Sequence, residues 1–220
     1  MSRMRRDGGV YHVESLSVST AQSMVTEHHY LHRSASCSHA FGLIAPGGMV
    51  GEIVGVVMYG TPASAPVRSG VCGPDERFNV IELTRLWIAD CVPSNAESFL
   101  IGNTLRRIPK DIVLSYADPA YGHVGTVYQA TNWLYTGLSA KRTDWSIPGV
   151  DGHGQSLSDR YSSAELREAY GETFKIVARP RKHRYVMLLG DRRRRKELRK
   201  KLRYPVLPYP KMQHGIGASA

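Results

Sequence analysis

Two β-rich stretches near the middle of the chain flank one helical stretch, and this order restricts the folds that the chain can adopt. Residues 80–88 (VIELTRLWI) alternate with a period of two, and residues 112–116 (IVLSY) are largely apolar, so both are predicted to be strands. Between them, Ser94 and Asn95 precede a helical pattern that ends at Pro109. Because a helix that crosses between two strands favours parallel pairing, the central sheet is expected to contain a parallel pair.

The segments before this unit predict an antiparallel part of the sheet. A Pro-Gly-Gly turn separates residues 41–45 from residues 50–59, and the two stretches are predicted to form a hairpin. Residues 61–74 are rich in Pro, Gly, Ser and Ala and are expected to be a surface loop. The other elements expected here are a loose arm over the first ten residues, a strand at 10–16 and a helix from Ser19-Thr20 to Tyr30.

The segments after the parallel pair complete a mixed sheet with helices around it. The elements expected here are a short helix at 126–134, a strand at 133–138, a helix that Ser162-Ser163 and Glu165 cap and Gly171 ends, strands at 174–178 and 185–189, and a basic helix at 191–202. The predicted fold class is therefore α/β (α+β), with a mixed central sheet flanked by helices. We expect residues 1–190 to form the main folded domain and residues 191–220 to form a basic helix and a Pro-rich tail.

Length and apolar patterning favour a cytoplasmic protein. The chain has 220 residues, enough for one domain with a substantial core. No apolar stretch approaches the roughly 20 residues that span a bilayer, and the basic start lacks a following apolar region. We therefore expect no membrane partner. The three cysteines are widely spaced and odd in number, so free thiols are expected.

Positive charge is concentrated near the C-terminus. Residues 179–203 carry 13 of the 29 Lys and Arg residues but only two acids, whereas the whole chain has a formal charge of +10. A nearly neutral body with a basic tail is typical of a folded domain that binds a polyanion, although a solvated charged helix is the alternative. The residues expected to contact nucleic acid are Arg181, Lys182, Arg184, Arg192, Arg193, Arg194, Arg195, Lys196, Arg199 and Lys200.

Residues 115–137 (SYADPAYGHVGTVYQATNWLYTG) combine an acid, a histidine, a tryptophan and four tyrosines directly after a predicted strand. A packed strand and helix do not require this mixture. The loop after the C-terminal end of a buried strand is where α/β sheets place ligands, and Asp118 lies in that loop. The stretch is therefore predicted to carry chemistry.

This motif, together with ELTRL at residues 82–86 and KHRYVMLLG at residues 182–190, resembles the phage Mom family of DNA adenine-modification proteins. The resemblance covers roughly residues 20–210. It implies a GNAT-like acyltransferase fold and conversion of adenine in phage DNA to N6-carbamoylmethyladenine, which hides the DNA from host restriction enzymes. Double-stranded DNA is then the expected partner.

The resemblance also implies site residues. Arg85, Asp118 and Tyr128 are the main catalytic candidates. Ser115, His123 and His29 are weaker ones, with His28 as an alternative to His29. The residues expected to bind substrate or cofactor are Tyr116, His123, Gly125, Thr126, Asn132 and Trp133.

Each main candidate also has a structural interpretation. Asp118 before a proline is a common turn former, and Tyr128 could be a core aromatic residue. Arg85 could form an ion pair with Glu82 or Glu52.

A metal site is the open question of this region. His28 and His32 are four residues apart at a predicted helix end, and the family has been associated with iron. No third ligand has an evident spacing, although Cys37 and His39 follow on a loop. His28 and His32 are the candidates if a metal binds.

The expected chemistry starts from the adenine N6 amine, a weak nucleophile that a duplex conceals. The base must be flipped into a pocket, where Tyr116, Tyr121 or Trp133 could stack on it. An ionised Asp118 could then accept a proton from N6, and Tyr128 could donate one to an oxyanion or leaving group. Arg85 could hold a phosphate or a carbonyl group.

The choice of acyl donor depends on a Gly-rich loop that this sequence lacks. The family has been linked with acetyl-CoA, which GNAT enzymes hold through a Gly-rich loop before a helix, but residues 90–97 here read DCVPSNAE and contain no glycine. Acetyl-CoA also lacks the nitrogen of the added group. Glycyl-tRNA supplies that nitrogen and is the favoured donor, with acetyl-CoA and iron as the alternative. Two other functions stay open: a GNAT-like acyltransferase that acts on a protein or small amine, and a non-enzymatic basic phage protein that coats DNA.

Overall fold

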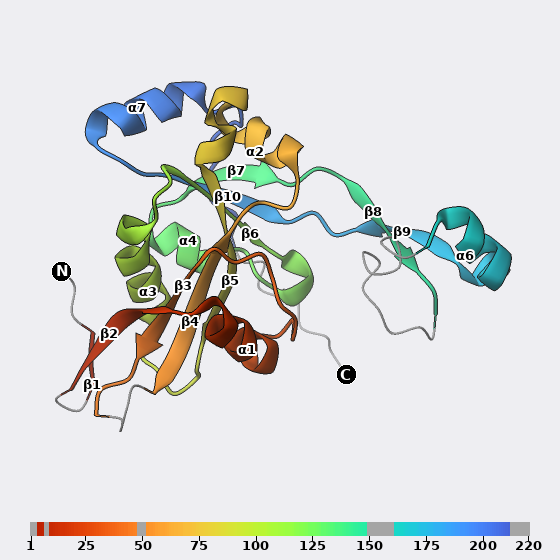
Figure 1. The fold of residues 1–220 in the computed structure, drawn as a ribbon. Helices are drawn as coiled ribbons and strands as arrows, with labels where there is room; N and C mark the ends of the chain where they lie inside the picture. The colour runs from red at the N-terminus through yellow and green to blue at the C-terminus, as the bar shows by residue number, and fades with distance from the viewer. Residues whose placement is uncertain (1–3, 7–8, 48–51, 149–160, 212–220) are drawn as a thin grey trace.

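The fold is built on one eight-stranded mixed sheet (Figure 1). The computed structural model describes residues 4–6, 9–47, 52–148 and 161–211. In spatial order the strands are β1 (Met4–Arg6), β2 (Gly9–Leu16), β3 (His39–Ile44), β4 (Ile53–Gly60), β5 (Val80–Ile88), β6 (Ile112–Ala117), β10 (His183–Leu188) and β7 (Leu134–Leu138). Every neighbouring pair is antiparallel except β5 and β6. The mixed sheet and its parallel pair are thus confirmed.

The two parallel strands separate part-way along their length. Their pairing runs from Val80 opposite Ile112 to Glu82 opposite Leu114 and ends there, although β5 continues to Ile88 and β6 to Ala117. The connection between them contains α3 (Ala96–Thr104), as the crossover predicts. Beyond Glu82 the sheet therefore opens between β5 and β6.

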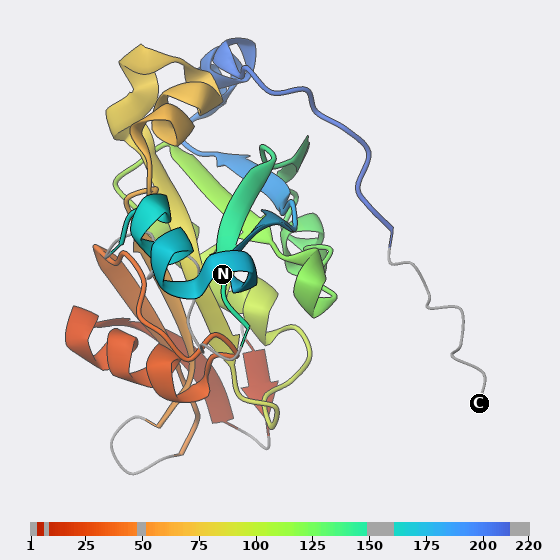
Figure 2. The ribbon, with the colours of Figure 1, turned by 90° about the vertical axis from the view of Figure 1, so that its right-hand side faces the viewer.

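Helices cover both faces of the sheet (Figure 2). The alternation of β5 divides the core, because Ile81 and Leu83 pack with α3 whereas Val80 packs on the opposite face. α3 and the short α4 (Thr126–Ala130) lie on the first face, and the second face is covered by α1 (Val18–His28), α2 (Ala65–Cys72) and α7 (Arg192–Lys201). No helix in the described ranges is long and apolar enough to span a membrane.

The basic helix α7 is attached to the sheet rather than detached from it. Leu198 is fully buried in the core cluster that α2, β6 and β10 share. The following residues run back along the sheet, where Leu207 N donates to Tyr135 O at 3.0 Å and Tyr209 Oη donates to Trp133 O at 2.8 Å. The C-terminal segment thus stabilises the strands that carry the central motif.

A second, two-stranded sheet extends away from the main one (Figure 1). It consists of β8 (Arg142–Ser146) and β9 (Lys175–Arg179), with α6 (Ser163–Tyr170) beside it. Trp145, Ile147, Leu166 and Phe174 form its small core. The capping box of α6 is present as predicted, since Ser162 Oγ accepts from Glu165 N and Glu165 Oε2 accepts from Ser162 N.

Three local expectations were wrong. Residues 61–74 are not a loop, because α2 begins at Ala65, with proline near its first turn, and buries Val71 and Cys72; burial outweighs the weak helix propensity of this stretch. Met4–Arg6 is not a loose arm but pairs with β2. Helix α1 begins at Val18, since Ser17 rather than Ser19-Thr20 provides its cap. Cys37 and Cys72 are free thiols, as expected.

Candidate active site

The opening between β5 and β6 brings together three groups from different elements. Ser115 on β6 is buried, and its hydroxyl lies 3.0 Å from the carbonyl oxygen of Leu83 on β5 and 2.8 Å from Tyr128 Oη on α4. A serine has one proton to donate, so when it donates to the carbonyl it accepts from the tyrosine. Burial raises the pKa of Tyr128 to about 12. Tyr128 is therefore a neutral hydrogen-bond donor near pH 7.

Asp118 lies just past the end of β6, in the loop predicted to carry chemistry. It caps the 3-10 turn η3 (Pro119–Tyr121), where Oδ1 accepts from Ala120 N at 3.1 Å. Its Oδ2 lies 2.8 Å from Lys182 Nζ in an ion pair whose Asp118 side chain is only 13% exposed. Both carboxylate oxygens are thus already bonded.

Arg85 holds β5 to the segment that follows α1. Its guanidinium donates to the carbonyl oxygens of Thr84 at 2.7 Å and Ser34 at 3.1 Å, while Nε is buried without a partner. Within the described chain Arg85 forms no ion pair with Glu82 or Glu52, so that alternative is wrong for Arg85. Burial lowers the pKa of Arg85.

Aromatic rings and histidines surround the mouth of the opening. His29 ends α1, and its ring stacks on Tyr30 with centroids 4.2 Å apart. Tyr30 in turn lies 4.6 Å from Tyr121 and 5.4 Å from His123, centroid to centroid. Burial, aided by the charge of Arg85, lowers the pKa of His29 to about 4, so this imidazole is neutral at pH 7. The two tyrosines are about half exposed and offer ring faces to a ligand.

The other predicted binding residues divide into exposed and packed ones. Trp133 is fully buried against Tyr128, with centroids 5.1 Å apart, so its ring supports Tyr128 and offers no face to a base. Gly125 has a φ of 80°, and a Cβ there would lie 2.4 Å from the Tyr185 ring, so only glycine fits. Asn132 has a φ of 61° in the turn after α4, and Thr126 begins that helix in an exposed position.

Sequence reasoning missed Glu82 as a site residue. It lies on β5 at the last paired position before the strands separate. Burial raises the pKa of Glu82 to about 7, although the charges of Lys182 and Arg85 oppose this rise. The sequence contained a signal for this position. Glu82 is two residues from Val80 on the same strand, so its side chain lies on the same face of the sheet as the buried Val80.

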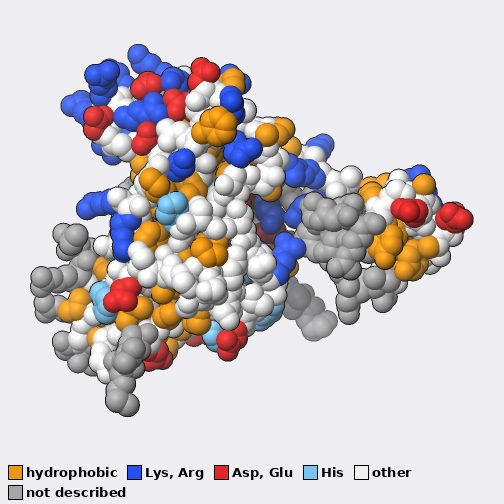
Figure 3. Space-filling model, in the orientation of Figure 1, with side chains coloured by type: hydrophobic (Ala, Val, Ile, Leu, Met, Phe, Trp, Pro, Cys, Tyr) orange, Lys and Arg blue, Asp and Glu red, His pale blue; other side chains and the backbone are white. Residues whose placement is uncertain are grey.

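The basic residues of the C-terminal region have two different roles. Arg194 donates to Glu76 and Asp111, and Lys201 Nζ lies 2.7 Å from Glu76, so both attach α7 to the domain. Arg181 and Arg184 donate to main-chain carbonyl groups of residues 136–139. The exposed face of α7, visible at the top of Figure 3, consists of Arg192, Arg193, Arg195, Lys196, Arg199 and Lys200.

The histidines at the end of α1 do not form a metal site. His28 stacks on Trp87 with centroids 4.6 Å apart, and His32 Nδ1 lies 3.1 Å from the carbonyl oxygen of Thr26. In the part of the chain that the structure describes, no three His, Cys, Asp or Glu side chains are placed to hold one ion. The residues present here therefore do not fit an iron centre.

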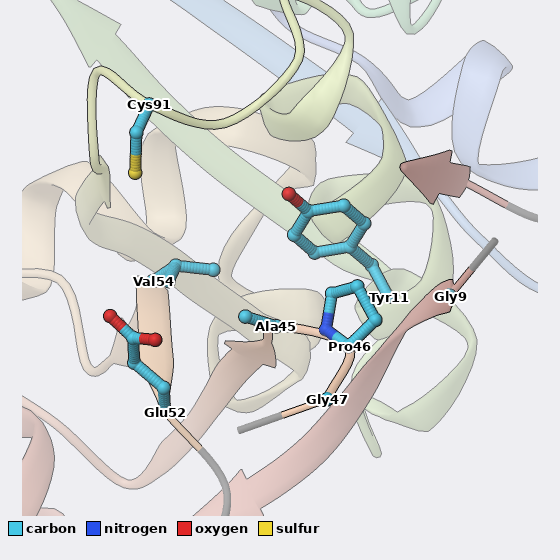
Figure 4. Close-up of a pocket in the computed structure, with 8 residues that line it drawn as sticks. All are labelled: Gly9, Tyr11, Ala45, Pro46, Gly47, Glu52, Val54 and Cys91. Atoms are coloured by element: carbon cyan, nitrogen blue, oxygen red, sulfur yellow. The ribbon is translucent and has the colours of Figure 1, made fainter. Parts of the chain in front are cut away.

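One pocket of about 340 Å³ lies at the other end of β4 and β5 (Figure 4). It is lined by Gly9, Tyr11, Ala45, Pro46, Gly47, Glu52, Val54 and Cys91. Val54 accepts a hydrogen bond from Ala89, which follows the last residue of β5, so this pocket is remote from Glu82. None of the predicted site residues lines it.

Comparison with known proteins identifies the family. The sequence model of the Mom protein family matches residues 10–211. The chain belongs to the Mom family. A similar Mom protein, the methylcarbamoylase mom of Escherichia phage Mu, is 29% identical over 207 residues, which cover 90% of this chain and 83% of the phage Mu protein.

Structural similarity extends to acetyltransferases. An N-acetyltransferase from Staphylococcus aureus shares 7% identity with a TM-score of 0.45, covering 82% of this Mom protein and 99% of its own chain. The GNAT domain of S. lividans PAT shares 12% identity with a TM-score of 0.42, covering 86% and 96%.

Proposed function

We propose that the protein transfers an acyl-type unit to N6 of adenine in DNA, and that the product is N6-carbamoylmethyladenine, which protects phage DNA from restriction. Family membership and the similarity to the methylcarbamoylase of phage Mu support the substrate class. The observation that carries the proposal is the opening between β5 and β6. The groups at this opening are the buried hydrogen-bond donor Tyr128, the carboxylate of Glu82, and an exposed aromatic rim formed by Tyr30 and Tyr121.

The rim suits a base that has left the duplex. A flipped adenine costs a few kcal/mol of lost stacking and pairing, which aromatic faces inside the protein replace. Tyr30 and Tyr121 are exposed at the rim, and Tyr116 lies deeper on β6. We assign stacking on the base to these three tyrosines, and charge stabilisation at the mouth to Lys182, which Asp118 holds in place.

The donor is proposed to be a glycyl ester, with glycyl-tRNA as its cellular form. Asp90 in the connection from β5 to α3 and Glu97 in the first turn of α3 add negative charge, and Pro93 lacks an N–H group. A pyrophosphate is therefore disfavoured at the start of α3. The exposed cations of α7 suit a second nucleic acid as well as the first.

The chemistry accounts for the product without a redox step. N6 attacks the ester carbonyl carbon and expels the tRNA hydroxyl group, which leaves N6-glycyladenine. The free glycyl amine then attacks ring carbon C6 and forms a five-membered spiro intermediate. Departure of the amide nitrogen from C6 leaves a carbamoylmethyl group on the new ring-bound nitrogen.

Nucleoside mass spectrometry tests the proposed function. DNA from cells that express the protein should contain deoxyadenosine that has gained C2H3NO, and cells expressing Tyr128→Phe at equal soluble levels should lack it. Unmodified DNA from cells with soluble wild-type protein would overturn the proposal.

A further inference from the structure

Glu82 lies where the sheet opens, near four other charged or polar groups of the site. Its carboxylate is on the last residue of β5 that pairs with β6. Burial raises the pKa values of Tyr116 on β6 and Tyr128 on α4, and the negative charge of Glu82 adds to both rises. The cations that act on it are Arg85, on the same strand, and Lys182, just before β10.

Glu82 has no hydrogen bond and no ion pair to any of the residues that the structure describes. The two nearby cations are committed elsewhere, since Lys182 pairs with Asp118 and Arg85 donates to carbonyl groups. A largely buried carboxylate without a partner is costly, and such groups concentrate at functional sites. The folded chain therefore retains an ionisable group that does nothing for its stability.

Asp118 is less suited than Glu82 to accept a proton. Protonation of Asp118 would weaken both the Lys182 ion pair and the Ala120 hydrogen bond. Glu82 loses no hydrogen bond on protonation, and burial already favours its neutral form. A general base with a pKa close to the working pH exchanges protons most effectively.

We propose that Glu82 is the catalytic base that removes a proton from adenine N6, and this inference rests on the proposed function. As the N6 lone pair bonds to the ester carbonyl carbon, the carbonyl π electrons move to its oxygen, to which Tyr128 donates a hydrogen bond. The N6 proton passes to Glu82. When the intermediate collapses, the bond to the leaving oxygen breaks, and that oxygen takes the proton from Glu82, which returns to its carboxylate form.

The test measures adenine modification in cells that express wild-type protein, Glu82→Gln or the control Glu52→Gln, which replaces an exposed acid near the remote pocket. Loss of a general base typically lowers a rate by about 10²- to 10⁴-fold. Glu82→Gln should therefore reduce modification at least about 100-fold, whereas Glu52→Gln should not change it. If the wild type modifies DNA and Glu82→Gln retains more than about a tenth of that level, Glu82 is not the base. Unmodified DNA from the wild type would instead contradict the proposed function itself.

A second measurement separates catalysis from a structural role. Because the pKa of Glu82 is raised on folding, its ionisation opposes folding as the pH rises from about 4.5 to about 7. Glu82→Gln should thus unfold at a higher temperature than the wild type at pH 8, and the difference should shrink at pH 5. A lower unfolding temperature of Glu82→Gln at pH 8 would show that the carboxylate holds the fold together, and would overturn the proposal.

Discussion

The hydroxyl groups of Ser115 and Tyr128 lie 2.8 Å apart inside the protein, although one belongs to a strand and the other to a helix. This contact depends on Gly125, whose positive φ starts α4 directly against Tyr185. When Tyr128 turns its proton toward a bound substrate, Ser115 can donate to the tyrosine oxygen in exchange for Leu83. The pair can therefore support a developing negative charge, at the expense of the hydrogen bond from Ser115 to the Leu83 carbonyl oxygen.

Replacing Tyr128 by phenylalanine should remove this proton donor while it keeps the packing against Trp133. We expect modification to fall by about 10²- to 10⁴-fold and the free energy of unfolding to fall by about 1 kcal/mol. The matched control is Tyr59→Phe, which removes another buried hydroxyl, bonded to Thr104 at 2.7 Å. Nucleoside mass spectrometry and urea unfolding provide the two readouts. If both variants lost modification equally, Tyr128 would have a structural role in the core and would not be the proton donor.

Glu76 should control how α7 is attached, in a pH-dependent way. Its carboxylate accepts from Arg194 and Lys201 with only 8% of the side chain exposed, and the hydrogen bonds from Arg194 lower the pKa of Glu76 to about 2. A lowered pKa stabilises the fold above about pH 4.5, and this contribution disappears as the pH falls toward 2. Glu76→Gln should therefore cost roughly 2–3 kcal/mol at pH 7 and much less at pH 3, measured by urea unfolding.

The control for Glu76 is Glu197→Gln. Glu197 contacts the same two cations, at 3.0 Å from Arg194 and 2.7 Å from Lys201, but its side chain is 45% exposed. Since exposed ion pairs contribute little, this variant should unfold nearly as the wild type does. Equal destabilisation by the two substitutions would show that burial is not what matters here.

The exposed face of α7 should supply most of the salt dependence of DNA binding. Changing Arg192, Arg193, Arg195 and Lys196 to Gln removes cations that have no partner among the described residues, so folding should be unaffected. Each lost phosphate contact should reduce the slope of log affinity against log salt by about 0.9. Substitution is preferable to deleting the helix, because deletion would also remove the buried Leu198. The control is the double variant Arg106→Gln with Arg167→Gln. If the α7 variant keeps the wild-type slope, as this control should, the exposed face of α7 is only solvated and does not contact phosphates.

Periodicity predicted the central sheet because its strands obey local rules. Residues 80–83 alternate, and the helix that follows favours a crossover, so the parallel pairing of β5 with β6 followed from the chain alone. The alternation breaks after Leu83, where the pairing of β5 with β4 shifts register, so that Leu86 packs on the same core as Leu83. The helix α2 was missed because its composition resembles a loop, and only packing of Val71 and Cys72 makes it helical. Strand β8 lacked a pattern of its own, since it is paired with β9 some 30 residues later.

The sequence predicted only part of the candidate site. The central motif located Ser115, Asp118 and Tyr128 on one side of the opening. The partners of these residues could not be read from the sequence, because Lys182 reaches Asp118 only through the pairing of β10 with β6. Glu82 was hidden for the same reason, since its isolation depends on which cations are occupied elsewhere.

The isotope content of the product should identify the donor. Purified protein, duplex DNA and tRNA charged with glycine labelled at both carbons and nitrogen should yield modified adenine that carries all three labels, whereas acetyl-CoA in place of glycyl-tRNA should yield none. The rearrangement also predicts where the nitrogen label resides. Because the glycyl amine displaces the original N6 from C6, the label should remain on the purine when the carboxamide is lost by fragmentation in the mass spectrometer, and the unlabelled carboxamide nitrogen should be the former N6. Nitrogen label in the carboxamide would exclude the spiro step, and carbon label delivered from acetate but not from glycine would overturn the glycyl donor.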